Sequence, residues 1–232
     1  MTEGCEADSG ALHFPCMGIE VRDKWRAASA GAHYAGKRWS SERQRQRDPR
    51  RIAALLAEHL AARPGTLPGA VLLDVPCGTG RLRAALTRHG HYVGLDVSPA
   101  MLAAARTDGA RGQALLLGEA QRLPFRDASF DAVVCCRLLH HLAERAALER
   151  IVAELVRVSR GLVIASFWDA GSLPAWRRRV FPGARPPRRH ARPRAELAAV
   201  FAQSGADVLA FEHSWRFVAR QAFVVARKRE SE

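Results

Sequence analysis

The fold is decided by the stretch Leu72-Leu-Asp-Val-Pro-Cys-Gly-Thr-Gly-Arg81, which continues a short apolar run that begins at Ala70. Apolar and β-branched residues predict a buried strand that ends in the acidic residue Asp74. The glycines after it predict a tight turn into a helix over residues 81–88. In an open α/β sheet, ligands bind at the carboxyl ends of the strands, where glycines let the backbone approach them closely.

Strands and helices alternate outward from this stretch. Ser98-Pro99 predicts a helix start, with Ser as the N-cap and Pro at the first helical position. A long helix follows the fourth strand, with Leu148, Ile151 and Leu155 on its inner face. This alternation indicates a parallel sheet that is covered on both faces. Its expected strands are residues 70–74, 92–96, 114–117, 130–136 and 161–167.

The last third of the chain follows a different pattern. A helix is expected over residues 195–204, and two strands, 207–213 and 222–228, follow without a helix between them. Consecutive strands of this kind indicate an antiparallel pair at the edge of the sheet. The predicted fold class is therefore α/β, a Rossmann-like doubly wound sheet that is mostly parallel and ends in an antiparallel strand pair.

The glycine-rich turn also indicates the type of ligand. A dinucleotide fingerprint has the pattern G-x-G-x-x-G, but Arg83 stands where its third glycine is needed. Asp74 would repel a phosphate and would suit a cationic ligand. A second acid, Asp96, ends the next strand 18 residues after Gly78, where a carboxylate usually holds ribose hydroxyls. The pattern therefore favours a nucleoside cofactor without a pyrophosphate.

Four segments together resemble the class I S-adenosylmethionine-dependent methyltransferases, over roughly residues 50–228 and most specifically over 71–142. They keep the order and spacing of that family's motifs, and the resemblance implies its seven-stranded fold and S-adenosyl-L-methionine as the cofactor. The four segments are Asp74-Val-Pro-Cys-Gly-Thr-Gly80, Tyr92-Val-Gly-Leu-Asp96 with Val-Ser-Pro-Ala-Met-Leu after it, Gly118-Glu-Ala-Gln-Arg-Leu-Pro-Phe125 with Ser129-Phe-Asp-Ala-Val-Val, and Leu139-His-His-Leu142.

Carried over position by position, the resemblance implies a cofactor site in three parts. Its methionine end would be lined by Asp74, Cys77, Gly78 and Gly80. Asp96 would bind the ribose, Val97 would pack on the adenine, and Glu119-Ala120 would border it. One residue departs from the family pattern. Pro76 stands where the first glycine of the loop is usual, and it removes one backbone N–H.

No catalytic base can be read with the same clarity. His140 or His141 follows the fourth strand beside the expected site, and His140 is a weak candidate for a base that deprotonates the acceptor. The alternative is that one of them caps a helix and the other packs. Cys135 and Cys136 with these histidines could suggest a metal, but adjacent strand residues point to opposite faces. We therefore expect no metal site.

The formal net charge of +13 is concentrated in two segments. Residues 37–51 carry +5 and residues 177–194 carry +8, the latter from eight Arg and no acid, and the remainder is balanced. The basic loop at 177–194 is either a solvated loop that reflects codon usage or an acceptor-recognition loop for an anionic group. The candidate substrate-binding residues are Tyr34, Arg38, Arg188 and Arg189.

The expected organisation is a flexible tail (1–20), an N-terminal arm or lid (21–49) and a methyltransferase domain (50–229). No apolar run reaches the roughly 18 residues that a membrane span needs, and the acidic N-terminus lacks the layout of a signal peptide. The five cysteines are odd in number and form no CxxC pair, which fits a reducing compartment. A cytoplasmic location is therefore expected.

These features predict a methyltransferase that acts on a small-molecule or lipid-like acceptor, more plausibly anionic than cationic. One alternative is an RNA-modifying methyltransferase that uses the Arg-rich segments. Nucleic acid is not favoured, because few aromatic residues accompany the arginines for base stacking, with Trp176 and Phe181 nearby. The other alternative is a non-catalytic scaffold that keeps the cofactor fold. The oligomeric state cannot be read from the sequence.

Overall fold

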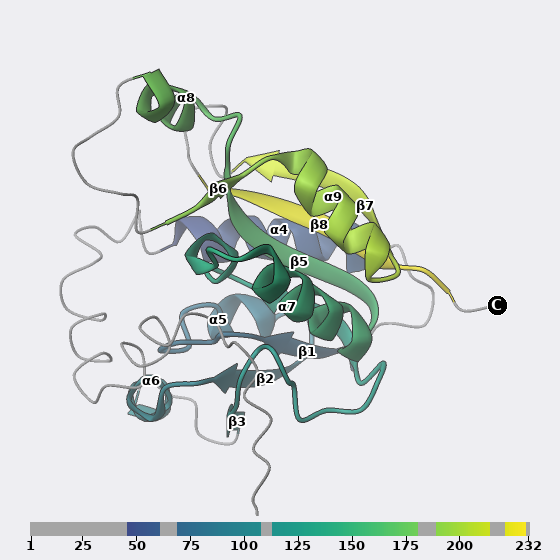
Figure 1. The fold of residues 1–232 in the computed structure, drawn as a ribbon. Coiled ribbons are helices and arrows are strands. Elements are labelled where there is room, and N and C mark those ends of the chain that lie inside the picture. The colour runs from purple at the N-terminus through teal and green to yellow at the C-terminus, as the bar shows by residue number, and fades with distance from the viewer. Residues whose placement is uncertain (1–45, 61–68, 108–112, 181–188, 214–220, 231–232) are drawn as a thin grey trace, which may run out of the picture.

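The computed structural model describes residues 46–60, 69–107, 113–180, 189–213 and 221–230. Within these ranges one sheet runs through the molecule in the order β3-β2-β1-β4-β5-β8-β7, and β6 pairs with β5 outside this path (Figure 1). The strands are β1 Val71–Asp74, β2 His91–Asp96, β3 Ala114–Leu117, β4 Phe130–Cys135, β5 Ser159–Asp169, β6 Ala191–Arg192, β7 Ala206–His213 and β8 Gln221–Lys228.

The predicted α/β sheet with its C-terminal antiparallel pair is confirmed. Strands β1 to β5 pair in parallel, whereas β8 is antiparallel to both β5 and β7. The strand order turns at β1, which lies between β2 and β4. A crevice opens at such a switch point, because the connections on its two sides leave in opposite directions.

Helices cover both faces of the sheet. The helices are α4 Arg47–Leu60, α5 Arg83–Leu86, α6 Pro99–Thr107, α7 Arg145–Val158, α8 Leu173–Val180 and α9 Arg194–Gln203, with a short 3-10 helix η1 Leu139–His141. In Figure 1, α7 and α9 lie in front of the sheet, whereas α4 and α5 lie behind it. Alternate residues of each strand therefore enter different cores: Leu73 packs with α7 and α9, and Leu72 packs with α4 and α5.

The prediction that residues 177–194 form a loop is wrong at both ends. Helix α8 continues to Val180, and β6 pairs Ala191 with Trp168 of β5. Leu173, Trp176 and Val180 recur at a spacing of three and four residues, which is typical of a helix. The many arginines around them made this pattern hard to recognise. The expected helix over 81–88 is also shorter, because turns occupy its first residues and α5 begins at Arg83.

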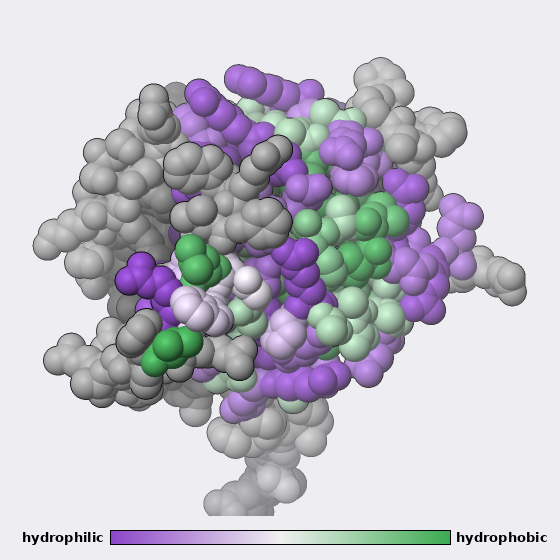
Figure 2. All heavy atoms as spheres, turned by 90° about the horizontal axis from the view of Figure 1, so that it is seen from above, coloured by the Kyte–Doolittle hydropathy of each residue, from purple (hydrophilic) through white to green (hydrophobic). Residues whose placement is uncertain are grey.

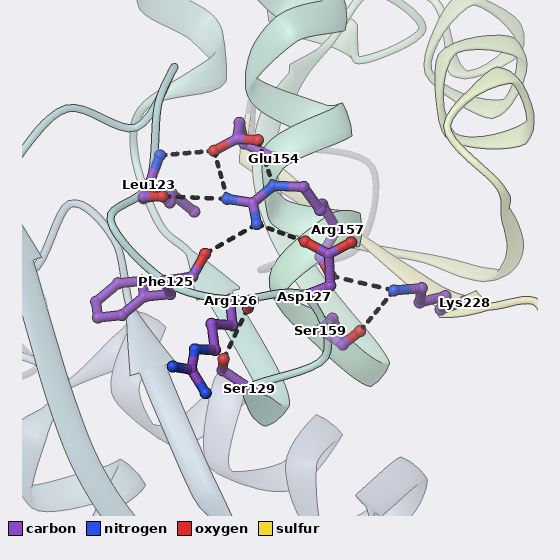
Figure 3. A network of polar contacts seen from close by, with 9 residues as sticks. All are labelled: Leu123, Phe125, Arg126, Asp127, Ser129, Glu154, Arg157, Ser159 and Lys228. Carbon is purple, nitrogen blue, oxygen red and sulfur yellow. Dashed lines mark hydrogen bonds and ion pairs between the residues drawn. The ribbon is translucent and has the colours of Figure 1, made fainter.

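A polar network ties α7 to the segment that leads from β3 to β4 (Figure 3). The Arg157 guanidinium donates to the carbonyls of Leu123 at 3.1 Å and Phe125 at 2.8 Å, and to Asp127 at 2.7 Å. Glu154 pairs with Arg157 at 2.6 Å and accepts the N–H of Leu123 at 2.6 Å. These charge-assisted bonds fix a loop that has no regular structure of its own.

We predict that Arg157→Ala lowers the free energy of unfolding by about 2–3 kcal/mol, because several hydrogen bonds to a charged group are lost at once. Chemical denaturation followed by circular dichroism measures this change. Arg145→Ala is the matched control, since Arg145 is an exposed residue of the same helix that pairs with Glu149. Equal midpoints for Arg157→Ala and the wild type would show that the network does not hold the loop.

Candidate cofactor site of a methyltransferase domain

A pocket opens at the carboxyl ends of β1 and β2, beside the switch point. Its wall is chiefly apolar, and Asp96 and Glu119 are the acidic residues that line it. The lining residues are Val75, Pro76, Leu95, Asp96, Val97, Gly118, Glu119, Ala120, Gln121, Leu138 and Ile151. Four residues that the sequence predicted for the adenosine end therefore gather here, namely Asp96, Val97, Glu119 and Ala120.

Asp96 is fixed at the rim of this pocket by the backbone around it. The carboxylate is 4% exposed, and it accepts the N–H of Gly78 at 2.8 Å and the N–H of Ser98 at 2.8 Å. Burial raises the pKa of Asp96, and these backbone hydrogen bonds act in the opposite direction. The backbone hydrogen bonds thus orient the carboxylate before any ligand arrives.

The glycine-rich turn brings the N–H of Gly78 to Asp96, and two of its glycines adopt positive φ angles. Gly78 has φ +57° and Gly80 has φ +77°, a region that other residues rarely adopt. Helix α6 begins as predicted, since Pro99 is its first residue and the Ser98 hydroxyl accepts the N–H of Met101 at 3.3 Å. Pro76 lines the pocket, and the neighbouring Cys77 donates its N–H to the carbonyl of Leu95.

Asp74 lies at the end of β1 and is fully buried. The Tyr92 hydroxyl donates to its Oδ2 at 3.1 Å, whereas its Oδ1 has no hydrogen-bond partner among the described residues. Burial raises the pKa of Asp74 to about 7, although Tyr92 and Arg81 act to lower it. An unpaired buried carboxylate oxygen is costly unless a donor satisfies it. The sequence did not single out Tyr92, although its position in the strand beside β1 was a usable signal.

A buried ion cluster connects the glycine-rich turn to the N-terminal helix. Asp48, at the start of α4, accepts from Arg81 at 2.9 Å and from Arg137 at 2.9 Å. Burial opposes ionisation of Asp48, yet the two guanidinium groups outweigh it, and the pKa of Asp48 is lowered. Sequence reasoning missed all three residues, because they are far apart in the chain and form no motif.

His140 is buried in the structure. It is 1% exposed, and its ring stacks on Trp168 with centroids 5.2 Å apart and planes 11° apart. The guanidinium of Arg189 lies over Trp168 at 5.2 Å, and the His140 carbonyl accepts the N–H of His190. In this arrangement His140 packs, and its role as a base stays a prediction.

The arginines of the basic segment do not all face solvent. Arg192 is 7% exposed and bonds to Glu196 and to the carbonyl of Leu142, while Arg194 pairs with Asp169 at 2.9 Å. Acids from outside the segment thus neutralise part of its charge. The candidate substrate-binding residues Tyr34, Arg38 and Arg188 lie outside the described residues.

Cys135 and Cys136 enter opposite cores of the sheet, as the strand geometry predicted. Burial raises the pKa of Cys136 to about 12, so this thiol stays protonated at neutral pH. In the part of the chain that the structure describes, no three His, Cys, Asp or Glu side chains gather in a way that could hold a metal ion.

Comparison with known proteins identifies the domain around this pocket. Residues 73–164, which run from β1 into β5, match the family model described as a methyltransferase domain. Residues 73–164 are thus similar to a methyltransferase domain. The match includes Asp74, Asp96, the residues that line the pocket and His140.

Curated relatives of the methyltransferase domain act on different acceptors. The tRNA (carboxymethyluridine(34)-5-O)-methyltransferase of Arabidopsis thaliana is 32% identical over 104 residues, which are 44% of this chain and 25% of that protein. The ubiquinone biosynthesis O-methyltransferase of Xylella fastidiosa (strain 9a5c) is 34% identical over 111 residues, which are 43% of each chain. The chain thus spans less than half the length of these two relatives.

A solved structure shows the same fold. The magnesium protoporphyrin IX methyltransferase of Synechocystis PCC 6803, crystallised with bound SAH, superposes with a TM-score of 0.71 at 17% identity. The superposition covers 90% of this chain and 99% of that one. At this identity the likeness shows a shared fold and no more.

We predict that Asp48→Asn lowers the free energy of unfolding by about 1–3 kcal/mol, because two part-buried arginines lose a charged partner. Since the folded state lowers the pKa of Asp48, its contribution is present above the ordinary pKa of about 4 and is lost as the pH falls through the lower folded value. Denaturation series at several pH values measure both effects.

Asp207→Asn serves as the control for this substitution, since Asp207 pairs with Arg229 on the surface. Its stability should follow that of the wild type at every pH. If Asp48→Asn also tracked the wild type through the acid range, the cluster would contribute nothing to stability.

Proposed function

We propose that this chain binds S-adenosyl-L-methionine at the carboxyl ends of β1 and β2 and transfers its methyl group to a small-molecule or lipid-like acceptor. The observation that carries the proposal is the pair of buried carboxylates, Asp74 and Asp96, at the ends of adjacent parallel strands. Oδ1 of Asp74 has no donor within the part of the chain that the structure describes, and Asp96 lines an apolar pocket.

The methionine end of the cofactor would use Asp74. An α-ammonium group is both a cation and a hydrogen-bond donor, so it supplies what the buried Oδ1 lacks. Cys77, Gly78 and Gly80 would line this end, since the turn they form follows Asp74 directly. They do not line the pocket described above, and Gly78 is joined to it through its hydrogen bond to Asp96.

The adenosine end would use the pocket itself. Asp96 accepts backbone N–H groups from Gly78, Ser98 and Val97, and its remaining acceptor capacity would receive the ribose hydroxyls. Val97, Leu138 and Ile151 offer apolar surface to a purine ring, and Glu119-Ala120 border the same space. These residues fit S-adenosyl-L-methionine: Asp74 would bind its ammonium group, Asp96 would bind its ribose, and the apolar walls would contact its adenine.

The transfer step requires little chemistry from the chain. When bound, the cofactor would supply an electrophilic methyl group: a lone pair of the acceptor would form the new bond to the methyl carbon, and the carbon–sulfur bond would break with its electron pair passing to sulfur. The acceptor loses its proton to solvent or to a base. Alignment of the two partners and exclusion of water therefore supply much of the acceleration. His140, which follows β4, stays a weak candidate for the base.

An RNA acceptor is the second candidate. A relative matched over 44% of this chain is a tRNA methyltransferase, and residues 177–194 carry eight Arg. Against it, Arg192 and Arg194 already bind Glu196 and Asp169. An RNA acceptor would require a steep salt dependence of RNA binding that is lost in Arg188→Ala/Arg189→Ala.

We predict that S-adenosylhomocysteine binds more tightly as the pH rises between about 6 and 8, by up to about tenfold per pH unit on the acid side. The reason is that Asp74 has a pKa of about 7 in the free protein and must ionise to attract an ammonium group. Calorimetric titrations at several pH values measure this slope. Asp74→Asn should bind weakly with no such slope, whereas the surface variant Asp207→Asn should match the wild type.

A second prediction concerns transfer itself. With a labelled methyl donor and a panel of metabolites, lipid extracts and RNA, the wild type should label one acceptor class. Asp96→Ala and Gly78→Arg should label none, because the first removes the ribose acceptor and the second forces a side chain into a strained φ of +57°. Equal labelling by all three proteins would contradict the assigned site. Cofactor binding without any labelling would favour a scaffold.

A further inference from the structure

Helix α8 presents an uncovered apolar stripe. Leu173, Trp176 and Val180 are 51%, 55% and 48% exposed, and their spacing places them within one narrow arc of the helix. Figure 1 shows α8 standing out from the body, beyond the two helical layers. At the left of the face in Figure 2, hydrophobic and hydrophilic side chains lie next to one another over this region.

Hydrogen bonds and ion pairs fix the segment 169–172 that precedes α8, although the apolar stripe of the helix is exposed. Asp169, at the end of β5, accepts from Arg194 at 2.9 Å, from His213 at 3.0 Å and from the N–H of Gly171 at 2.8 Å. Ser172 bonds to the Asp169 carbonyl, and its own carbonyl accepts the N–H groups of the first helical turn. The helix therefore projects from a fixed base rather than from a loose loop.

Positive charge flanks the stripe. Arg177 and Arg178 are exposed next to Trp176, and the segment 177–194 contains no acid. An apolar face with Trp and aliphatic residues beside arginines has the composition of a helix that lies in the interface of an anionic bilayer. We propose that α8 is an interfacial docking helix, which seats Leu173, Trp176 and Val180 among lipid headgroups and acyl chains while its arginines contact anionic lipids.

The stripe fits a lipid surface better than the other occupants. RNA would engage the arginines and could stack on Trp176, but Leu173 and Val180 would gain nothing from phosphates. A second copy of the chain would need an interface of about 1,000 Å² or more. An eight-residue helix is about 12 Å long and offers far less than that. Among the described residues, no helix is long and apolar enough to cross a membrane.

Docking would also orient the cofactor site. Residues 170–172 alone separate α8 from the carboxyl end of β5, the same edge of the sheet at which Asp74 and Asp96 lie. This consequence rests on the proposed function, since it would bring a lipid-like acceptor to the methyl donor. The docking itself does not depend on catalysis and can be measured separately.

Vesicle flotation tests the proposal with the full chain and two lipid mixtures, phosphatidylcholine alone and phosphatidylcholine with phosphatidylglycerol. The wild type should float with the anionic vesicles and much less with the neutral ones. Leu173→Ser/Trp176→Ser should weaken this binding about tenfold or more, because the buried apolar area is lost. Arg177→Glu/Arg178→Glu should weaken it at least as strongly, since each Arg near an anionic surface contributes about fivefold.

The matched controls are Leu209→Ser, an apolar residue that is 45% exposed on β7, and Arg88→Glu/Arg106→Glu, two exposed arginines elsewhere. Both should float like the wild type. The proposal is overturned if the wild type does not float with anionic vesicles, or if both α8 variants float to the same extent as the wild type. It is also overturned if the α8 substitutions abolish RNA binding or dissociate a dimer without any effect on vesicle binding.

A titration of the same variants with S-adenosylhomocysteine separates the two proposals. Every α8 variant should bind this cofactor product like the wild type, because α8 does not line the pocket. If the wild type bound anionic vesicles but not S-adenosylhomocysteine, the proposed function would be contradicted and the docking surface would be supported.

Discussion

Two carboxylates buried at the ends of adjacent parallel strands are the constraint on which the candidate site depends. Asp74 ends β1 and Asp96 ends β2, and neither is more than 4% exposed. Burial of a carboxylate costs free energy unless hydrogen bonds or opposite charge compensate it. The backbone N–H groups of Gly78 and Ser98 compensate Asp96, whereas among the described residues Asp74 receives one hydroxyl and its Oδ1 has no partner. The described residues therefore leave room for one further donor at Asp74 Oδ1, which an ammonium group would supply.

The two cores hold this edge of the sheet in place. Strand residues alternate between a core with α7 and α9 and a core with α4 and α5, so neither face can shift without exposing apolar side chains. Polar anchors then fix the irregular parts: Arg157 pins the segment after the adenosine-end residues, and Asp48 ties α4 to the glycine-rich turn through Arg81. Loops that surround the site thus gain order from side chains that lie outside it.

The sequence predicted the sheet and the cofactor edge because both depend on local patterns. Apolar runs that end in Asp74 and Asp96, with glycines between them, are visible in the sequence. The structure shows that Gly78 and Gly80 have positive φ. The Asp48 cluster could not be read, because its residues meet only in three dimensions. The composition of the basic segment predicts a loop, because its many arginines outweigh the helical spacing of Leu173, Trp176 and Val180. Their exposure, which distinguishes a docking surface from a core, is visible only in the structure.

The central claim is that the unsatisfied oxygen of Asp74 receives the ammonium group of the cofactor while Asp96 holds its ribose. A crystal structure of the chain with S-adenosylhomocysteine tests it most directly. We expect the amino nitrogen within hydrogen-bond distance of Asp74 Oδ1, both ribose hydroxyls on Asp96 and the purine against Val97. A ligand bound elsewhere, or one bound in this pocket with Asp74 Oδ1 still unpaired, would contradict it.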